Sequence, residues 1–537
     1  MKSPTRKEFE TTYPVCRSAV GLCKWQQIFE RVPGECTLAT FSKILAAYGE
    51  GLGLPDFLPD LAGLEWNLYQ AEAGMDNIPF RVDKDLINPT LQLLSVSWKH
   101  LPSLLRTEEN ISARTPEPGK DFILIWRDSR TGKVRAEAAA DRDLLALKIV
   151  MEGIDVREVA SKGNVSVTAV EGAVADAVRK GLILSPPSGL RRDSDSFPAA
   201  QNTDEVFLSS PVFTLQWHIT QACDLHCKHC YDRSDRSALK LDQAIGVLED
   251  LWNFCHHRRV RGQVSFTGGN PLLYPHFLEL YRAASEKGFI LAILGNPVPK
   301  DNIEELISIQ APAFFQVSLE GLEEKNDAVR GPGHFKRVVR FLDVLRDLKI
   351  YSMVMLTLTR YNMDQVLPLA HFLKERADCF TFNRLSQVGE GSNLQLPEPD
   401  LYRRFLRAYG EAAADNPIMA LKDNLINILH HLEGKPLFGG CCGYGCGAAF
   451  NFMAVLPDGE AHACRKFPSL IGHVFQQTIA EIYDSELACR YRAGSSACRS
   501  CSIRPVCGGC PAVIHGQGGN VFNDRDPYCF MESENKS

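Results

Sequence analysis

Cysteine is the residue type whose number and spacing most strongly indicate chemistry in this chain of 537 residues. Ten of its 18 cysteines lie between Cys441 and Cys529, and three more fall within eight residues in the segment CDLHCKHC at 223–230. In a reducing compartment, clustered cysteines of this kind indicate metal or iron–sulfur ligands, because a disulfide framework would not persist there.

The segment CDLHCKHC combines three thiols on one short loop, at Cys223, Cys227 and Cys230. Three thiolates can ligate three irons of a 4Fe-4S cluster and leave the fourth iron free to bind another molecule. A zinc site is the alternative, in which His226 or His229 would supply the fourth ligand of a tetrahedron. Iron and sulfide content separates the two hypotheses.

Strand-like and helical patterns alternate from residue 213 to residue 385, and the cysteine loop directly follows the first strand. Strands are expected at 213–219, 264–267, 290–294, 314–318, 351–358 and 379–385. Six such βα units predict an α/β fold with a parallel sheet curled into a partial (β/α)6 TIM-like barrel, since a closed barrel has eight. The loop would then stand at the carboxyl end of the sheet, where this architecture places its chemistry.

Two further segments, VSFTGGNP at 264–271 and FQVSLEGLEEKNDAVRG at 315–331, accompany the cysteine loop. Together the three segments resemble the radical S-adenosylmethionine (SAM) superfamily. The resemblance implies that Cys223, Cys227 and Cys230 bind a 4Fe-4S cluster whose open iron is chelated by the amino and carboxylate groups of SAM. It also implies a set of SAM-binding residues: His229, Gly268, Gly269, Asn270, Pro271, Asn296, Ser318, Arg330 and Asn362.

Within that implied set, His229 would lie against the adenine, and the two glycines would face the SAM amino group. Ser318 and Arg330 would face the ribose and the carboxylate, to which a guanidinium can bind with two hydrogen bonds. Asn270 stands where the family usually has Glu. The reductive cleavage of SAM in this family yields methionine and a 5′-deoxyadenosyl radical that abstracts hydrogen from the substrate.

The C-terminal cysteines follow a second pattern: CCGYGC at 441–446, Cys464, two CxxC pairs, and Cys529. This pattern resembles the SPASM extension, which carries two auxiliary 4Fe-4S clusters. The resemblance implies one ligand set of Cys446, Cys464, Cys510 and either Cys442 or Cys441, with the choice within 441–446 left open. It implies a second set of Cys498, Cys501, Cys507 and Cys529.

Other interpretations of these cysteines remain open. The last pair, CGGC at 507–510, is one residue shorter than the family's usual CxxxC, and a zinc ribbon is the alternative for the two CxxC pairs. Cys489 is expected to be free. The five scattered cysteines are expected to be buried as small apolar residues: Cys16, Cys23, Cys36, Cys255 and Cys379.

Residues 88–190 combine strand-like runs with three short helical patterns, which predicts a winged-helix-like domain. Its third helix is mostly Val and Ala, and its charges are balanced, so a role in DNA binding is not expected. The segment resembles the PqqD-type domain that holds the leader of a ribosomal precursor peptide by strand addition. A purely structural packing role and a zinc-dependent winged-helix regulator are the alternatives.

Five segments are therefore expected: a helical domain at 1–80, the winged-helix-like domain at 88–190, the partial barrel at 210–395, a helical bridge at 396–440 and the SPASM domain at 441–537. A linker rich in Ser, Pro and charge spans 185–205. The helical domain resembles one found in some peptide maturases, of which the selenobiotic-type thio(seleno)oxazole maturases are the nearest subfamily.

Composition and charge narrow the class of protein. The net charge is −6, no run of apolar residues has the length of a membrane span, and the N-terminus has no signal-peptide core, which predicts a cytoplasmic protein that binds neither membranes nor nucleic acids. The resemblance implies a radical SAM peptide maturase that takes electrons from a flavodoxin or ferredoxin type of reductant. The alternatives are a haem-precursor enzyme and a sulfatase-type maturase, although Arg465 stands where sulfatase-type enzymes carry an acidic residue.

Overall fold

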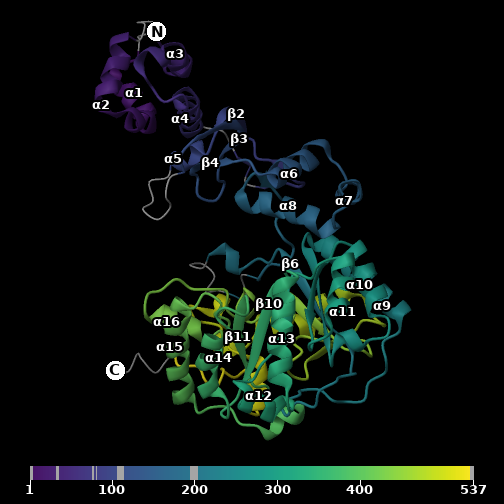
Figure 1. Cartoon of the computed structure of the whole chain (residues 1–537). Helices are drawn as coiled ribbons and strands as arrows, with labels where there is room; N and C mark the ends of the chain where they lie inside the picture. Colours follow the sequence, from purple (N-terminus) through teal and green to yellow (C-terminus); the bar gives the residue numbers. More distant parts are fainter. Residues whose placement is uncertain are drawn as a thin grey trace. The chain divides into compact units, whose positions relative to one another are not determined.

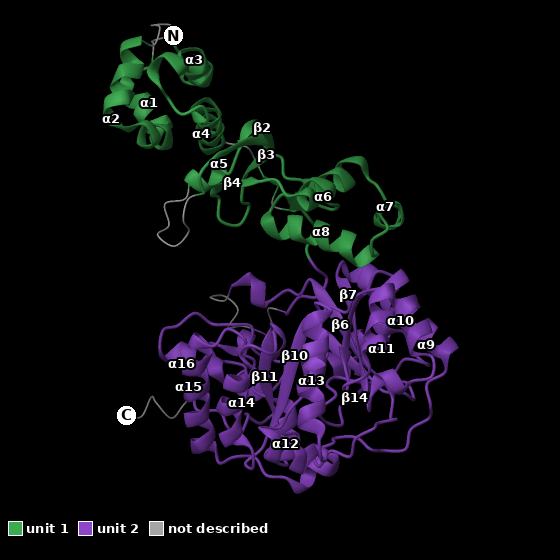
Figure 2. Ribbon diagram, in the orientation of Figure 1, with its two compact units in different colours: residues 1–187 green, residues 188–537 purple. Residues whose placement is uncertain are grey.

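A computed structural model describes residues 4–31, 36–74, 78–79, 81–105, 114–193, 197 and 204–531. The chain divides into two compact units, residues 1–187 (unit 1) and 188–537 (unit 2), coloured separately in Figure 2. The five segments expected from the sequence are thus grouped into two units, with barrel, bridge and cysteine-rich region together in unit 2. Much of the linker expected at 185–205 lies outside the described residues.

Unit 1 begins with four helices: α1 (Arg6–Thr12), α2 (Pro14–Arg31), α3 (Phe41–Tyr48) and α4 (Leu58–Ala73). Their core is aromatic, with Tyr13 and Trp25 both packed against Phe41. The buried carboxylate of Glu65 accepts hydrogen bonds from the backbone N–H groups of Val15 and Cys16 at 2.7 and 2.9 Å, and so satisfies the first turn of α2.

The second part of unit 1 is an antiparallel sheet followed by three helices (Figure 1). The sheet has the order β2 (Gln92–Lys99), β3 (Glu117–Arg127), β4 (Val134–Ala138), so β2 and β4 are its edges. The short helix α5 (Leu101–Leu104) follows β2, and α6 (Asp141–Glu152), α7 (Val156–Gly163) and α8 (Val167–Lys180) follow β4. Two short strands, β1 (Leu86–Ile87) and β5 (Ile183–Leu184), pair antiparallel.

The last helix of this part, α8, is capped at both ends. Gly181 takes a φ of 82° after the last residue of α8, a left-handed conformation that favours glycine. The side chain of Ser166 accepts a hydrogen bond from the N–H of Ala169 at the start of the same helix. Strand addition to this sheet would have to use β2 or β4, because β3 is paired on both sides.

Unit 2 is built on one sheet whose first six strands are parallel. They are β6 (Val212–Thr220), β7 (Arg261–Gly268), β8 (Ile290–Leu294), β9 (Phe315–Ser318), β10 (Ser352–Leu358) and β11 (Cys379–Arg384). Helices connect them: α9 (Leu241–Arg258), α10 (Phe277–Glu286), α11 (Lys300–Ile309), α12 (Glu323–Arg330), α13 (His334–Asp347) and α14 (Val366–Leu373). This is the open α/β architecture expected from the sequence.

The sheet does not stop at β6, which the sequence did not indicate. Strand β12 (Phe452–Val455) pairs parallel with β6, and β13 (Glu460–His462) and β14 (Leu470–His473) extend the sheet to nine strands. The bridge helices α15 (Pro399–Asp415) and α16 (Ile426–Leu432) lead to this region, and α17 (Ile479–Asp484), α18 (Glu486–Ala493) and α19 (Pro511–Gly516) follow it. The cysteine-rich region is therefore continuous with the barrel sheet.

Each hydrophobic core belongs to one unit. The largest buried cluster runs from Leu190 to Phe530 and includes Trp217 of β6 and Ala461 of β13. The other three clusters lie within unit 1. In the part of the chain that the structure describes, no helix is both long enough and apolar enough to cross a bilayer.

Candidate active site

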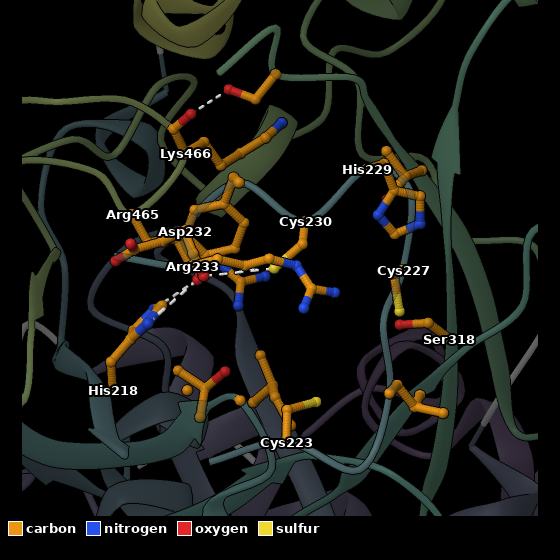
Figure 3. Close-up of a pocket in the computed structure, with 18 of the residues that line it drawn as sticks. His218, Cys223, Cys227, His229, Cys230, Asp232, Arg233, Ser318, Arg465 and Lys466 are labelled. Atoms are coloured by element: carbon orange, nitrogen blue, oxygen red, sulfur yellow. Dashed lines mark hydrogen bonds between the residues drawn. The ribbon is translucent and has the colours of Figure 1, made fainter. Parts of the chain in front are cut away.

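A cavity of about 380 Å³ opens at the carboxyl ends of the parallel strands of unit 2. The loop after β6 supplies one wall, with Cys223, Cys227 and Cys230, and the ends of β7 to β11 supply the others. Figure 3 shows the three cysteines around this space, with His229 and Ser318 on the same side as Cys227. The volume lies in the range of pockets that bind cofactors and small substrates.

Gly268 and Gly269 bring β7 into direct contact with the cysteine loop. A Cβ on Gly268 would lie 2.3 Å from the carbonyl oxygen of Thr220, and one on Gly269 would lie 2.2 Å from that of Ala222. The N–H of Gly269 donates to the Thr220 carbonyl at 2.9 Å. This N–H therefore fixes the start of the cysteine loop, and the expected contact of the glycine backbone with the SAM amino group stays a prediction.

Asp224 lies between the first two loop cysteines and receives two amide groups. Asn296 donates through Nδ2 to Asp224 Oδ1 at 2.6 Å, and Asn270 donates to the same oxygen at 3.3 Å. Asn296 Nδ2 also lies 3.7 Å from Cys223 Sγ. Asn270 is therefore complementary to Asp224, whereas the Glu that the family usually has at this position would face another carboxylate.

Glu320, on the segment after β9, has no exposed surface and lies between His229 and Arg330. Its Oε1 accepts from Nε and from one terminal nitrogen of Arg330, at 2.9 and 2.6 Å, and lies 2.9 Å from His229 Nε2. His229 and Glu320 are thus close enough for an ion pair, but the angle between them does not meet that of a hydrogen bond. Burial alone would raise the pKa of Glu320, but the charges of His229 and Arg330 outweigh it and lower the pKa to about 2.

This ion pair is a contact of Arg330 that the sequence did not indicate, and its expected contact with SAM stays a prediction. The resemblance pointed its guanidinium at the carboxylate of SAM, but Glu320 already accepts two of its hydrogen bonds. The remaining terminal nitrogen lies 3.5 Å from Cys227 Sγ. Arg330 thus connects a buried carboxylate to the cysteine loop, and Glu320 in turn accepts from the N–H of Thr357 at the end of β10.

The remaining SAM-binding residues expected from the sequence divide between the cavity and the core. Ser318 and His229 line the cavity. Asn362 does not line it, is 2% exposed, and donates to the carbonyls of Glu320 and Thr357, so its side chain serves to join two strand ends. Pro271 is buried at the start of a short 3-10 helix and does not line the cavity either.

The cysteines of the C-terminal region form two groups around small cavities. A space of about 50 Å³ is lined by five thiols: Cys441, Cys442, Cys446, Cys464 and Cys510. A second of about 20 Å³ is lined by four: Cys498, Cys501, Cys507 and Cys529. These are the two groups expected from the sequence. Both Cys441 and Cys442 belong to the first group, with their sulfurs 3.7 Å apart, so the choice between them stays open.

The cysteines expected to have no ligand role lie elsewhere. Cys489 is exposed and lines neither small cavity. Of the five scattered cysteines, Cys16, Cys36, Cys255 and Cys379 are buried as expected. Cys23 is exposed, which corrects the expectation for that residue, because it lies on the outer face of α2.

Arg384, at the end of β11, lines both the large cavity and the five-thiol cavity. It is 2% exposed and forms two hydrogen bonds with Asp526 at 2.9 and 2.7 Å and one with Asp423 at 2.9 Å. Asp526 also accepts from the N–H of Cys510 and lines the four-thiol cavity. One buried ion-pair network thus contacts the walls of all three cavities.

The residues present fit a SAM molecule on a cluster held by three cysteines. Besides the three thiols, Asn270 Oδ1 is buried without a hydrogen-bond partner beside Gly295, which lines the cavity, and can accept from an ammonium group. Within the described residues, no three His, Cys, Asp or Glu side chains converge on a position for a single metal ion. A 4Fe-4S cluster binds each thiolate through a different iron.

Two family models match segments of the chain. Residues 217–373 match the radical SAM superfamily, and residues 446–511 match SPASM, an iron-sulfur cluster-binding domain. The chain carries a radical SAM domain and a SPASM domain. It therefore uses SAM and 4Fe-4S clusters.

Its relatives include enzymes of more than one kind. The AdoMet-dependent heme synthase of Methanosarcina barkeri is 24% identical over 346 residues, which cover 60% of this chain and 97% of that protein. The mycofactocin maturase MftC of Mycolicibacterium smegmatis is 27% identical over 340 residues, covering 60% and 83%. Among solved structures, Streptococcus suis SuiB bound to precursor peptide SuiA is 18% identical with a TM-score of 0.51, covering 76% of this chain and 96% of that one.

Several residues of the site were not identified from the sequence. Glu320 stands inside the segment FQVSLEGLEEKNDAVRG. The sequence alone could not indicate its role, because its burial beside Arg330 is visible only in the fold. Asp224 stands inside CDLHCKHC, where an acidic residue between two cysteines could have suggested a partner for Asn270. His218, on β6, lines the cavity 2.8 Å from the hydroxyl of Tyr231, and nothing in its local sequence marks it.

Proposed function

We propose that this enzyme modifies a ribosomally made precursor peptide, in an oxidative, thioether or thio/seleno-oxazole type of reaction. The observation that carries the proposal is the extent of the likeness to the SuiB structure. That likeness covers 76% of this chain, whereas unit 2 makes up only about two thirds of it. Part of unit 1 therefore belongs to the common fold, and SuiB was solved with a precursor peptide bound.

In this proposal Cys223, Cys227 and Cys230 hold the SAM-binding cluster, and bound SAM supplies a 5′-deoxyadenosyl radical for hydrogen abstraction. The protein's own contribution is positioning and exclusion of water. Asn296 and Asn270 hold the cysteine loop through Asp224. Gly268 and Gly269 let the loop approach β7. Arg330, whose charge is neutralised by Glu320, forms part of the cavity wall.

The two cysteine groups near the C-terminus would hold the auxiliary clusters. Four of the five thiols around the first small cavity and all four around the second are the ligands in this proposal. Such clusters can accept an electron from an oxidised substrate or bind a substrate thiolate. The buried Arg384, hydrogen-bonded to Asp423 and Asp526, would keep both sites in fixed positions next to the active-site cavity.

Unit 1 supplies the surface that would bind the leader of the precursor peptide. Side chains of the edge strand β2 point alternately toward the core and toward solvent. Leu93 is on the solvent-facing side and is 56% exposed. An added strand would gain main-chain hydrogen bonds from the edge and an apolar contact from this side chain. The domain at 88–190 is thus proposed as the leader-binding module, and residues 1–80 as a helical support.

A haem-precursor reaction is the second candidate, because the heme synthase of Methanosarcina barkeri matches over nearly its whole length. That match covers 60% of this chain, which unit 2 alone can supply. A haem-precursor enzyme would leave unit 1 without a function, and for this reason the peptide is preferred. The selenobiotic-type subfamily, a cytoplasmic location and a flavodoxin or ferredoxin type of reductant complete the proposal.

The direct test first searches for a short, Cys-rich reading frame next to the gene and then uses the peptide that it encodes as the substrate. The reconstituted enzyme, SAM, dithionite and the full-length peptide are incubated without oxygen, and the peptide mass is measured. A mass change that depends on SAM supports the proposal. An unchanged peptide, together with SAM-dependent conversion of an iron porphyrin supplied in parallel, would replace it with the haem-precursor reaction.

A further inference from the structure

The active-site cavity has a second side that none of the SAM-binding residues expected from the sequence occupies. His218 of β6, Met355 of β10 and Asn383 of β11 line it, together with Arg465 and Lys466, which follow Cys464. Figure 3 shows Arg465, Lys466 and His218 on one side of the cavity and Cys227, His229 and Ser318 on the other. This second side adjoins the five-thiol cavity, since Lys466 lines both spaces.

The charges on this side do not cancel. The only carboxylate among the described residues lining the cavity is Asp232, which is ion-paired at 3.2 Å with Arg236, a guanidinium that also pairs with Asp458 and Glu460. Arg384 is neutralised by Asp423 and Asp526. Three other cations line the cavity, and within the described part of the chain none of them has a carboxylate at ion-pair distance: Arg233, Arg465 and Lys466.

Among the described residues, no neighbouring carboxylate supplies the missing negative charge, but cysteine thiolates would supply some of it to two of the cations: Cys230 interacts with Arg233, and Cys441 and Cys464 interact with Lys466. Lys466 donates through Nζ to the carbonyl oxygen of Arg384 at 3.1 Å, a neutral acceptor. His218 is 1% exposed, and its burial, reinforced by the charge of Arg465, lowers its pKa to about 3, so its ring is neutral at physiological pH. Arg233 is exposed, whereas Arg465 is partly buried and has no carboxylate of a described residue at ion-pair distance, so Arg465 is the cation that most favours a ligand with a negative charge.

We propose that this side of the cavity binds a carboxylate of the substrate peptide between Arg233, Arg465 and Lys466. The inference rests on the proposed function and narrows its substrate class to peptides with a carboxylate next to the modified residue. Arg465 is the central group, because its guanidinium can donate two parallel hydrogen bonds to a carboxylate. The carboxylate belongs either to an Asp or Glu side chain or to the peptide's C-terminus.

The test measures binding by the full, reconstituted chain with SAM present and no reductant, so that nothing reacts. Three probes are compared: acetyl-GGEGG-amide, acetyl-GGQGG-amide and acetyl-GGGGG with a free C-terminal acid. We expect at least one carboxylate probe to bind about tenfold more tightly than the Gln probe, since a charge-assisted hydrogen bond is replaced by a neutral one. The tighter of the two acids identifies the source of the carboxylate.

Two variants test whether Arg465 causes the preference for a carboxylate probe. Arg465→Gln should reduce the tenfold preference to about twofold or less. Arg282→Gln, which changes an exposed arginine on α10 that does not line the cavity, should keep it. Equal binding of all three probes, or an unchanged preference in Arg465→Gln, overturns the proposal. A preference that exists without SAM and vanishes when SAM is added also overturns it, because SAM would then occupy these cations.

The outcome is distinguishable from failure of the proposed function. Modification of the full-length precursor is measured separately, by its change in mass. A carboxylate preference with no modification of any peptide would leave the subsite in place and refute the peptide-maturase function. Modification of a precursor whose Asp and Glu residues are replaced by Asn and Gln and whose C-terminus is amidated, at an undiminished kcat/KM, would refute the subsite alone.

Discussion

Asp224 organises the cysteine loop at the scale of single side chains. Asn270 and Asn296 both donate to its Oδ1, and Asn296 also approaches Cys223. Cys223 and Asp224 are both exposed, and the residues just before them are held by the backbone N–H groups of Gly269 and Asn270. The two side-chain amides add to these bonds and help to determine where the first thiol lies relative to the cavity.

Replacing Asn270 by Glu should place a second carboxylate beside Asp224 and displace the loop. Like charges in a partly buried site repel, so we expect loss of about one cluster's iron and at least a tenfold fall in 5′-deoxyadenosine formation. The double variant Asn270→Glu with Asp224→Asn should recover most of both, because an amide again faces a carboxylate. Asn302→Glu, on the exposed face of α11, is the matched control, and failure of the double variant to recover would refute this pairing.

At the scale of elements, the segment from β9 through α12 to α13 supports one wall of the cavity. Asn326 accepts from the N–H of Glu320 through Oδ1 and donates to Nδ1 of His334, the first residue of α13. His334 is 1% exposed. Burial lowers its pKa to about 4, and the nearby Arg330 and Arg337 act in the same direction, so its ring is neutral in the folded protein.

This histidine should make unit 2 less stable in mild acid. The folded state keeps His334 neutral down to about pH 4, whereas the unfolded chain takes up the proton near pH 6.5, so stability present at pH 7 is lost as the pH falls through that window. The expected loss is about 2 kcal/mol at pH 5. Urea denaturation of the full chain at pH 7 and pH 5 measures it. In His334→Gln the same pH change should cost about 2 kcal/mol less, and an identical pH dependence in both proteins would contradict the argument.

The elements themselves were largely predictable, because they depend on local patterns. The strand at Ile290–Leu294 has the bounds expected from periodicity alone. The pairing of β12 with β6 could not be predicted, because a four-residue strand gives no signal about a partner more than 200 residues earlier. The hydrogen bonds of Arg330 and Asn362 could not be predicted for a related reason: their protein partners become neighbours only in the folded chain.

At the scale of the whole molecule, the two units have separate cores and separate proposed tasks. Unit 2 contains the large cavity and both small cysteine cavities. Unit 1 contains the edge strands proposed to bind the leader. Their separate cores make each unit able to be removed without opening the core of the other.

Deleting residues 1–187 should therefore spare SAM cleavage and remove modification of the full-length precursor. Without leader binding, the concentration of the core peptide at the cavity falls, and we expect modification to drop by at least a hundredfold at micromolar peptide. Peptide mass and 5′-deoxyadenosine are measured in the same reactions. A precursor without its leader, given to the intact enzyme, is the matched control and should be modified as slowly. Undiminished modification by the truncated enzyme would show that unit 1 has another role.

The claim on which everything else depends is that Cys223, Cys227 and Cys230 hold the cluster that cleaves SAM. The most direct measurement is 5′-deoxyadenosine formation by the intact enzyme and by its triple Cys→Ala variant, both reconstituted without oxygen and reduced with dithionite. The intact enzyme should hold about 12 iron and form 5′-deoxyadenosine, while the variant should hold about 8 iron and form none. Continued 5′-deoxyadenosine formation by the triple variant would contradict the assignment.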